Sequence, residues 1–222
     1  MNNNTIEIEL RYEILDAKQI DSFLSSAKYL HQKHDIDVYL DTPDATLWKR
    51  GVFIRIRNDK KLDFKFNRTC LQNPEIGLLD YCEEHSFSLP LEKAKLQNIN
   101  MVLESLNLKT TSNADLVCLT SINNLDAHYI VDKIRTSYAY NDFTIMVDEV
   151  AGLGTFLEIE VMATNINDLE NVKKNMQQTL NGLNLLPLQI GYGSLLLRKS
   201  NFDYYVQGRY VLQEDKNMLG TC

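Results

Sequence analysis

A strict alternation of apolar and charged residues near the N-terminus is the feature that most limits how this chain can fold. Side chains two residues apart on a β-strand point to the same face of a sheet. In the segment 5–12 the two faces would carry Ile6, Ile8, Leu10 and Tyr12 on one side, and Glu7, Glu9 and Arg11 on the other. This pattern alone is also typical of an ordinary surface strand in an antiparallel sheet. The charges on the other strands are therefore needed to tell whether this charged face points to solvent or into the protein.

Four later segments alternate in the same way, and their charges sort by sign. Their charged faces carry Arg55 and Arg57 in 52–58, Lys65 in 62–67, Lys133 and Arg135 in 130–137, and Glu158 and Glu160 in 155–162. Inward-facing polar faces of a closed sheet would gather the acidic residues into a cation site and the basic residues into an anion site. We therefore predict an α+β fold: a closed antiparallel β-barrel of about eight strands that forms a polar tunnel, with covering helices on its apolar outer faces.

The segments between the charged strands are expected to supply those helices. Apolar residues at helical spacing predict three helices, over 16–32, 90–108 and 167–183. Asp16 is the expected N-cap of the first. We interpret residues 1–200 as the tunnel domain and residues 201–222 as a peripheral C-terminal tail.

Other segments are predicted less sharply. Residues 67–79 read as a loop and 116–121 as a short apolar strand. A strand over 81–89 would carry Glu83 and Glu84 on opposite faces, and the pattern leaves open which of the two faces the tunnel.

Two further features favour structural roles over chemistry. Asp35, Asp37 and Asp41 share one face of a predicted strand, and we interpret them as a solvated surface in preference to part of a metal site. Trp48, the only tryptophan, is expected to pack in the core.

The composition excludes several classes of function. The formal net charge of −7 argues against a nucleic-acid binder or a binder of anionic membranes. No apolar run approaches the 18 or so residues of a membrane span, and the polar N-terminus does not resemble a secretory signal. The four cysteines lie far apart without metal-ligand spacing, so we expect reduced thiols in a cytoplasmic protein. The oligomeric state is left open, with a homodimer as one option.

Five motifs in order resemble those of the CYTH family, also called triphosphate tunnel metalloenzymes. They are Glu7-x-Glu9-x-Arg11, Tyr39-Leu-Asp41-Thr42-Pro43, Phe53-Ile-Arg55-Ile-Arg57, Asp148-Glu149-Val150-Ala-Gly152-Leu-Gly154 and Phe156-Leu-Glu158-Ile-Glu160-Val161. The resemblance extends to about Lys199. Arg11 stands where the family's first motif has lysine, which keeps the positive charge in a larger, planar group.

The resemblance implies phosphoryl or nucleotidyl transfer at a triphosphate with Mg²⁺ or Mn²⁺ as the cofactor. It implies substrate binding by Arg11, Arg55, Arg57, Lys65, Lys133 and Arg135, and metal binding by Glu7, Glu9, Asp148, Glu158 and Glu160. Of these, Glu7, Glu9, Arg55, Arg57 and Lys65 are the expected catalytic residues. Arginine offers planar bidentate contacts to phosphate, and Mg²⁺ prefers oxygen ligands, so both sets suit this chemistry.

Three functions fit this prediction. The first is a metal-dependent hydrolase of inorganic triphosphate or of a small organic triphosphate, such as thiamine triphosphate or a nucleoside triphosphate. The second is a class IV adenylate cyclase, which would make cyclic AMP and pyrophosphate from ATP. The third is a binding module for polyphosphate or nucleotide without catalysis. We favour the hydrolase, because the sequence shows no signature for adenine recognition and hydrolysis needs only the tunnel.

Overall fold

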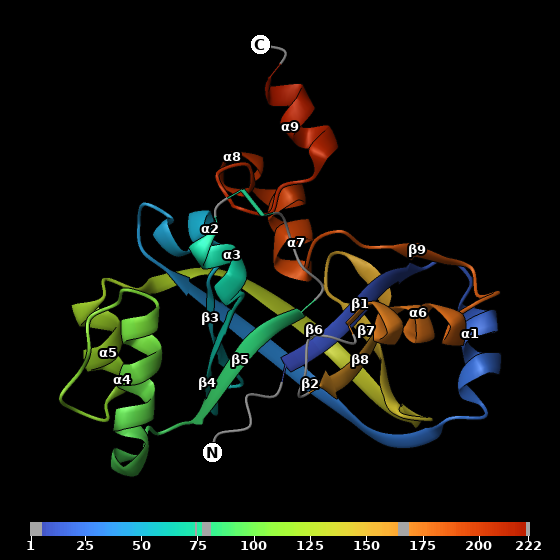
Figure 1. The fold of residues 1–222 in the computed structure, drawn as a ribbon, viewed down its shortest axis with the longest axis horizontal. Helices are drawn as coiled ribbons and strands as arrows, with labels where there is room; N and C mark the ends of the chain where they lie inside the picture. Colours follow the sequence, from blue (N-terminus) through green and yellow to red (C-terminus); the bar gives the residue numbers. More distant parts are fainter. Residues whose placement is uncertain (1–5, 74, 77–80, 164–168, 221–222) are drawn as a thin grey trace.

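Eight antiparallel strands close into a barrel in the computed structural model, which describes residues 6–73, 75–76, 81–163 and 169–220 (Figure 1). The strands are β1 (Ile6–Ile14), β2 (Lys28–Asp41), β3 (Phe53–Arg57), β4 (Lys61–Phe66), β5 (Tyr81–Ser88), β6 (Asp126–Tyr140), β7 (Phe143–Val150) and β8 (Gly154–Ala163). They run around the barrel in the order β5-β4-β3-β2-β6-β7-β8-β1. This confirms the predicted fold class.

Strand β1 closes the barrel. It pairs with β8 over eight positions, from Ile6 opposite Ala163 to Glu13 opposite Phe156. Its other edge pairs with β5 near Glu7 and with the short strand β9 (Leu185–Pro187) near Glu13. Strand β1 therefore has hydrogen-bonded neighbours on both edges, and its charged face, with Glu7, Glu9 and Arg11, points into the barrel.

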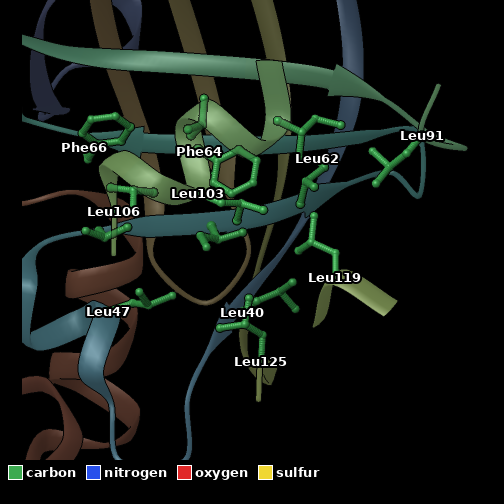
Figure 2. Packing of buried hydrophobic residues seen from close by; sticks show 14 residues of the cluster. Leu40, Leu47, Leu62, Phe64, Phe66, Leu91, Leu103, Leu106, Leu119 and Leu125 are labelled. Atoms are coloured by element: carbon green, nitrogen blue, oxygen red, sulfur yellow. The ribbon is translucent and has the colours of Figure 1, made fainter. Parts of the chain in front are cut away.

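Helices cover the outer faces of the barrel on two sides (Figure 1). On one side, α1 (Ala17–Leu24) and α6 (Leu169–Thr179) cover an apolar layer that includes Ile8, Ile145 and Ile159. On the other side lie α4 (Leu96–Ser105), which follows a short 3₁₀ turn at Lys93–Lys95, and α5 (Leu116–Ile122). Figure 2 shows the side chains of this second layer, Leu103 and Leu119 among them, meeting Leu62 and Phe64 of β4.

The predicted helix over 16–32 is wrong in its second half. Asp16 caps α1 as expected, because its side chain accepts hydrogen bonds from the backbone N–H groups of residues 18 and 19. The helix ends where Ser25 and Ser26 donate their hydroxyls to carbonyls three residues back. From residue 28 the chain forms β2, whose long pairing with β6 outweighs the local helical spacing.

The predicted strand over 116–121 is also wrong, since these residues form α5. A short apolar run does not distinguish a buried strand from a buried helix. Asp115 stabilises the start of the helix as its N-cap, because its carboxylate accepts a hydrogen bond from the N–H of Cys118 at 2.7 Å.

The predicted loop 67–79 contains a short helix, α3 (Arg68–Gln72), which is capped by Asn67. Residues 74 and 77–79 of that predicted loop lie outside the described residues. The helix predicted over 167–183 is present as α6 from Leu169.

The C-terminal segment packs on one end of the barrel (Figure 1). Helices α2 (Thr46–Arg50), α7 (Tyr192–Ser200), α8 (Phe202–Tyr205) and α9 (Gln213–Leu219) lie together there. Trp48 is buried, as expected, and its indole N–H donates to the carbonyl of Tyr204 at 3.0 Å. Residues 202–212 thus share a core with residues 45–53.

No helix in the described part of the chain has the length and hydropathy that a membrane span requires.

The layer under α4 gives a test of the fold. Leu103 is 0% exposed, whereas Met101 on the same helix is 59% exposed. We expect Leu103→Ala to lower the free energy of unfolding by about 2–5 kcal/mol, because it leaves a cavity between α4 and β4. Met101→Ala is the matched control and should change that free energy by less than about 0.5 kcal/mol. Equal losses in urea denaturation would show that α4 does not pack as described.

Candidate functional site

The barrel encloses a cavity of about 970 Å³ that is lined by charged side chains from its strands. All six basic residues predicted for substrate binding line it: Arg11, Arg55, Arg57, Lys65, Lys133 and Arg135. Four of the five predicted metal ligands also line it: Glu7, Glu9, Glu158 and Glu160. The barrel therefore brings together residues from β1, β3, β4, β6 and β8.

Strand alternation explains this convergence. The two basic residues of β3 lie two apart and point inward, and β4 pairs with β3 so that Lys65 stands opposite Phe53 on the same face. On the closing strand, Glu9 stands opposite Glu160, and Arg11 opposite Glu158. Inward side chains of neighbouring strands are thereby placed within ion-pair distance.

Lys65 joins the two acidic residues of the first strand. Its Nζ lies 2.8 Å from Oε1 of Glu7 and 2.9 Å from Oε1 of Glu9. Arg11 forms an ion pair with Glu9 and donates from Nε to Oε2 of Glu158 at 2.9 Å. These contacts link the acidic residues of β1 and β8 through basic side chains.

Two acidic partners of the β3 arginines, Asp37 and Asp63, were missed as site residues, and a third, Glu84, was one of two candidates on its strand. Arg57 donates from Nε to Asp37 at 2.6 Å. Arg55 contacts Asp63 at 3.0 Å and Glu84 at 3.0 Å. The interpretation of the aspartates at 35, 37 and 41 as solvated surface is wrong, because all three are buried. Only Asp37 lines the cavity, whereas Asp41 accepts the backbone N–H groups of Leu47 and Trp48 at the start of α2.

Glu84 answers the register question on β5. It lines the cavity, whereas Glu83 forms an ion pair with Arg68 outside it. His85 stacks on Phe66 with 5.7 Å between ring centroids, which agrees with a structural role for this histidine.

Asp148 differs from the other predicted metal ligands. It is 0% exposed and is not among the residues that line the cavity. It accepts hydrogen bonds from Nε and one terminal nitrogen of Arg135, at 2.7 and 2.6 Å, and Lys133 lies 3.3 Å away. These contacts hold the two basic side chains of β6 toward the cavity. The metal-ligand role of Asp148 stays a prediction, since it requires the carboxylate to exchange these partners.

Burial and charge pairing shift the pKa values of the acidic residues in opposite directions. For Glu9, burial favours the neutral form, but Arg11 and Lys65 overcome it and lower its pKa to about 2. Glu160 lacks such close basic neighbours, so burial and the neighbouring Glu158 raise its pKa to about 7. The carboxyl groups on β8 therefore differ in protonation near neutral pH, because Arg135 and Arg11 hold the pKa of Glu158 well below its usual range despite burial.

Among the basic residues, Lys133 has an unusual pKa. Burial and the adjacent charge of Arg135 lower it to about 8, although Asp148 opposes the shift. Lys133 therefore carries its full charge only below that pH, while the arginines around it stay charged.

The donor set fits a divalent cation. Mg²⁺ and Mn²⁺ take carboxylate oxygens and retain several waters, and a cavity of this size has room for both. Glu7, Glu9, Glu158 and Glu160 offer such oxygens from two adjacent strands. On the opposite edge of β1, ligand atoms of Glu7, Glu9 and Cys82 lie within 4.8 Å of one another.

One end of the cavity is aromatic. Tyr39 and Tyr129 stack with 4.6 Å between ring centroids, and Phe53 stacks on Tyr210 at 6.3 Å. All four side chains line the cavity, as does the segment around Tyr210 from residue 209 to residue 213. The C-terminal segment therefore contributes to this end, which the sequence analysis did not predict.

Comparisons with known proteins agree with this architecture. A candidate adenylate cyclase of Methanocaldococcus jannaschii is 22% identical over 182 residues, which cover 81% of this chain and 90% of that protein. The crystal structure of a candidate adenylate cyclase from Vibrio parahaemolyticus superposes with a TM-score of 0.58 and 18% identity, covering 87% of this chain and 98% of the other.

Two further solved structures share the fold. A Pyrococcus horikoshii protein has a TM-score of 0.57 and 20% identity, over 87% of this chain and 99% of its own. A candidate adenylyl cyclase from Hippeastrum, described as having a dominant triphosphatase activity, has a TM-score of 0.55 and 17% identity, over 94% of this chain and 98% of its own.

The family match covers the whole barrel. The family model described as the CYTH domain matches residues 5–189, which contain every strand of the barrel and all of the charged residues that line the cavity from those strands. This chain therefore belongs to the CYTH domain family.

Proposed function

We propose that this protein is a metal-dependent hydrolase that binds the triphosphate group of its substrate inside the barrel. The observation that carries the proposal is the convergence of the six predicted basic side chains and five glutamates in one cavity of the barrel. A triphosphate carries about four negative charges at neutral pH, and basic groups in a cavity shielded from water bind such charge far better than groups on a surface.

The basic residues have distinct tasks in this proposal. Arg55 and Arg57 present planar guanidinium groups, each of which would donate two hydrogen bonds to phosphate oxygens. Lys65 and Arg11 stand beside the glutamates of β1 and would stabilise the charge that develops on the leaving phosphate. Lys133 and Arg135, held by Asp148, would contact the phosphates from the opposite wall.

The glutamates would hold the divalent cation, for which we propose Mg²⁺ or Mn²⁺. When bound, such a cation neutralises phosphate charge and can supply or orient the attacking water. Because burial and Glu158 raise the pKa of Glu160 to about 7, binding of the cation by this residue would require the loss of its proton.

Charge balance explains why binding itself should need the metal. The six basic groups predicted for substrate binding stand beside eight carboxylates in the cavity wall or directly behind it. These carboxylates are Glu7, Glu9, Asp37, Asp63, Glu84, Asp148, Glu158 and Glu160, while Lys33, Arg209 and Lys216 also line the cavity. Without a divalent cation each of the six basic groups is neutralised by a carboxylate partner, so a triphosphate anion gains little by binding to them.

The aromatic end of the cavity favours an organic triphosphate over inorganic triphosphate. A planar ring system could stack against Tyr39, Phe53 or Tyr210 while its phosphates reach Arg55. Thiamine triphosphate and nucleoside triphosphates both meet this requirement.

The same observation keeps adenylate cyclase as the second candidate. An adenine ring at the aromatic end would place a ribose between the rings and the arginines, where its hydroxyl could attack in place of water. A related protein is named as a candidate adenylate cyclase. We place the hydrolase first because hydrolysis requires no hydroxyl nucleophile to be positioned by the chain. A non-catalytic binding module would retain the arginines without needing both glutamate pairs.

The proposed partner is a small molecule and not a nucleic acid. The basic groups lie inside the barrel, and the chain as a whole carries a formal charge of −7. We also propose a cytoplasmic location, which the absence of a disulfide at Cys82 and Cys118 among the described residues supports.

The direct test measures phosphate release from inorganic triphosphate, ATP and thiamine triphosphate with Mg²⁺, Mn²⁺ or EDTA, with cyclic AMP assayed in the ATP samples. We expect metal-dependent phosphate release without cyclic AMP, and faster turnover of an organic triphosphate than of the inorganic one. Glu7→Gln combined with Glu9→Gln should lower kcat/KM by more than about 100-fold, because amides are poor ligands for the cation.

Glu83→Gln is the matched control for that experiment, because Glu83 lies on β5 but outside the cavity. It should retain most of the activity. Full activity in the double variant would contradict the assignment of the glutamates. Cyclic AMP as the main product would favour the cyclase, and tight binding without turnover would favour the binding module.

The pH dependence of substrate affinity gives a second prediction. Because the pKa of Lys133 is lowered to about 8, this side chain loses its charge as the pH rises through that value. We expect KM for the triphosphate to rise between about pH 7 and pH 9, and Lys133→Arg to flatten that rise because arginine stays charged. Identical KM profiles for the two proteins would show that Lys133 does not contact the phosphates.

A further inference from the structure

A thiol faces the acidic wall of the cavity and has no part in the proposed reaction. Cys82 lies on β5 directly opposite Glu7 of β1, and it lines the cavity. Burial raises the pKa of its thiol to about 12, although Lys65 opposes the shift, so the sulfur is not an activated nucleophile.

The sulfur belongs to a compact set of ligand atoms. Sγ of Cys82 and one carboxylate oxygen each from Glu7 and Glu9 all lie within 4.8 Å of one another. Zn²⁺ binds sulfur at about 2.3 Å and carboxylate oxygen at about 2.0–2.2 Å, so side-chain rotations would have to bring these atoms closer by up to about 1 Å for all three to share one ion. Two strands fix the backbone positions of the three residues, because β1 and β5 are hydrogen-bonded neighbours.

A second observation shows that this position attracts positive charge. The ammonium group of Lys65 lies 2.8 Å from Glu7 and 2.9 Å from Glu9. A flexible lysine side chain can withdraw when a more highly charged ion arrives, which a backbone donor could not do.

The chemistry of the donors selects the ion. Mg²⁺ prefers oxygen ligands, whereas a thiolate favours softer ions such as Zn²⁺ and Cd²⁺. Glu7 and Glu9 are shared with the catalytic cation of the proposed function, but Cys82 adds a sulfur that this cation does not need.

We propose that Glu7, Glu9 and Cys82 form a binding site for a thiophilic divalent cation of the Zn²⁺ or Cd²⁺ type in the wall of the cavity. The metal–sulfur bond forms as the thiol releases its proton to solvent, and no redox change is involved. An ion bound there occupies both glutamates of β1 and inhibits Mg²⁺-dependent turnover. The binding does not depend on the proposed function; only the inhibition does.

The test is a titration of the full-length, chelator-treated protein with Cd²⁺, followed by the ultraviolet charge-transfer band of a cadmium–thiolate bond. We expect one equivalent of Cd²⁺ to produce the band in the wild-type protein and Cys82→Ser to abolish it. A Cys118→Ser, Cys222→Ser double variant, which removes thiols elsewhere in the chain, should keep the band.

Two further variants separate this site from simple thiol capture. Glu7→Gln should weaken Cd²⁺ binding by at least about tenfold while the thiol remains, and Lys65→Met should strengthen it by removing the competing ammonium. A band that persists in Cys82→Ser, or Cd²⁺ affinity that is unchanged in Glu7→Gln, would overturn the proposal.

The consequence for turnover is measured separately. Zn²⁺ at low concentration should inhibit the Mg²⁺-dependent reaction of the wild-type protein by at least about tenfold more than that of Cys82→Ser, each compared with its own uninhibited rate. Cd²⁺ binding in a protein without triphosphatase activity would contradict the proposed function and leave the metal site standing. Triphosphatase activity without the cadmium band would contradict the metal site and leave the proposed function standing.

Discussion

Pairing of opposite charges inside a closed sheet is the constraint on which the rest of this structure depends. An unpaired buried charge costs several kcal/mol, so six basic side chains can line one cavity only if carboxylates stand beside them. The register of the strands places these partners. Arg11 stands opposite Glu158, Arg57 donates a hydrogen bond to Asp37, and Lys65 forms ion pairs with both Glu7 and Glu9. Closure through β1 is what brings the last of these groups into place. The apolar layers under α1, α6, α4 and α5 then stabilise a barrel whose interior alone would not hold it together.

The same network prepares the site for a ligand. Each basic group is already held in position by a carboxylate, so a triphosphate entering the cavity meets side chains that need little further ordering. A divalent cation changes the balance, because glutamates that bind it no longer need the basic groups as partners. In the proposed function, metal binding and phosphate binding would therefore support each other, and the aromatic end would add a place for the rest of an organic substrate. The thiol of Cys82 lies at the acidic side of this network, where a softer ion could compete.

Much of this arrangement could be predicted from the sequence, because strand alternation has a period of two and leaves the charged face unmistakable. The six basic residues and the glutamates of β1 and β8 were placed correctly in this way. Local patterns failed where tertiary pairing outweighs them. Residues 28–32 continue a helical spacing but form β2, since β6 offers a long edge to pair with. Asp37 and Asp63 were missed, and Glu84 was left undecided against Glu83, because a carboxylate on an alternating strand looks the same whether it faces water or an arginine across the barrel. The contribution of Tyr210 to the cavity depends on how residues 201–220 dock on Trp48, which no local pattern records.

We propose that this cavity binds a triphosphate through basic side chains, and that a divalent cation frees these side chains by binding their carboxylate partners. Calorimetric titration of a non-hydrolysable triphosphate into the protein, with and without Mn²⁺, tests it most directly. The account predicts binding at one site per chain with Mn²⁺ and a loss of at least about 100-fold in affinity with EDTA, equivalent to about 2.7 kcal/mol. Arg55→Met should weaken the Mn²⁺-supported binding strongly, because it removes a guanidinium held between Asp63 and Glu84. Equally tight binding with EDTA, or binding unaffected by Arg55→Met, would contradict the account.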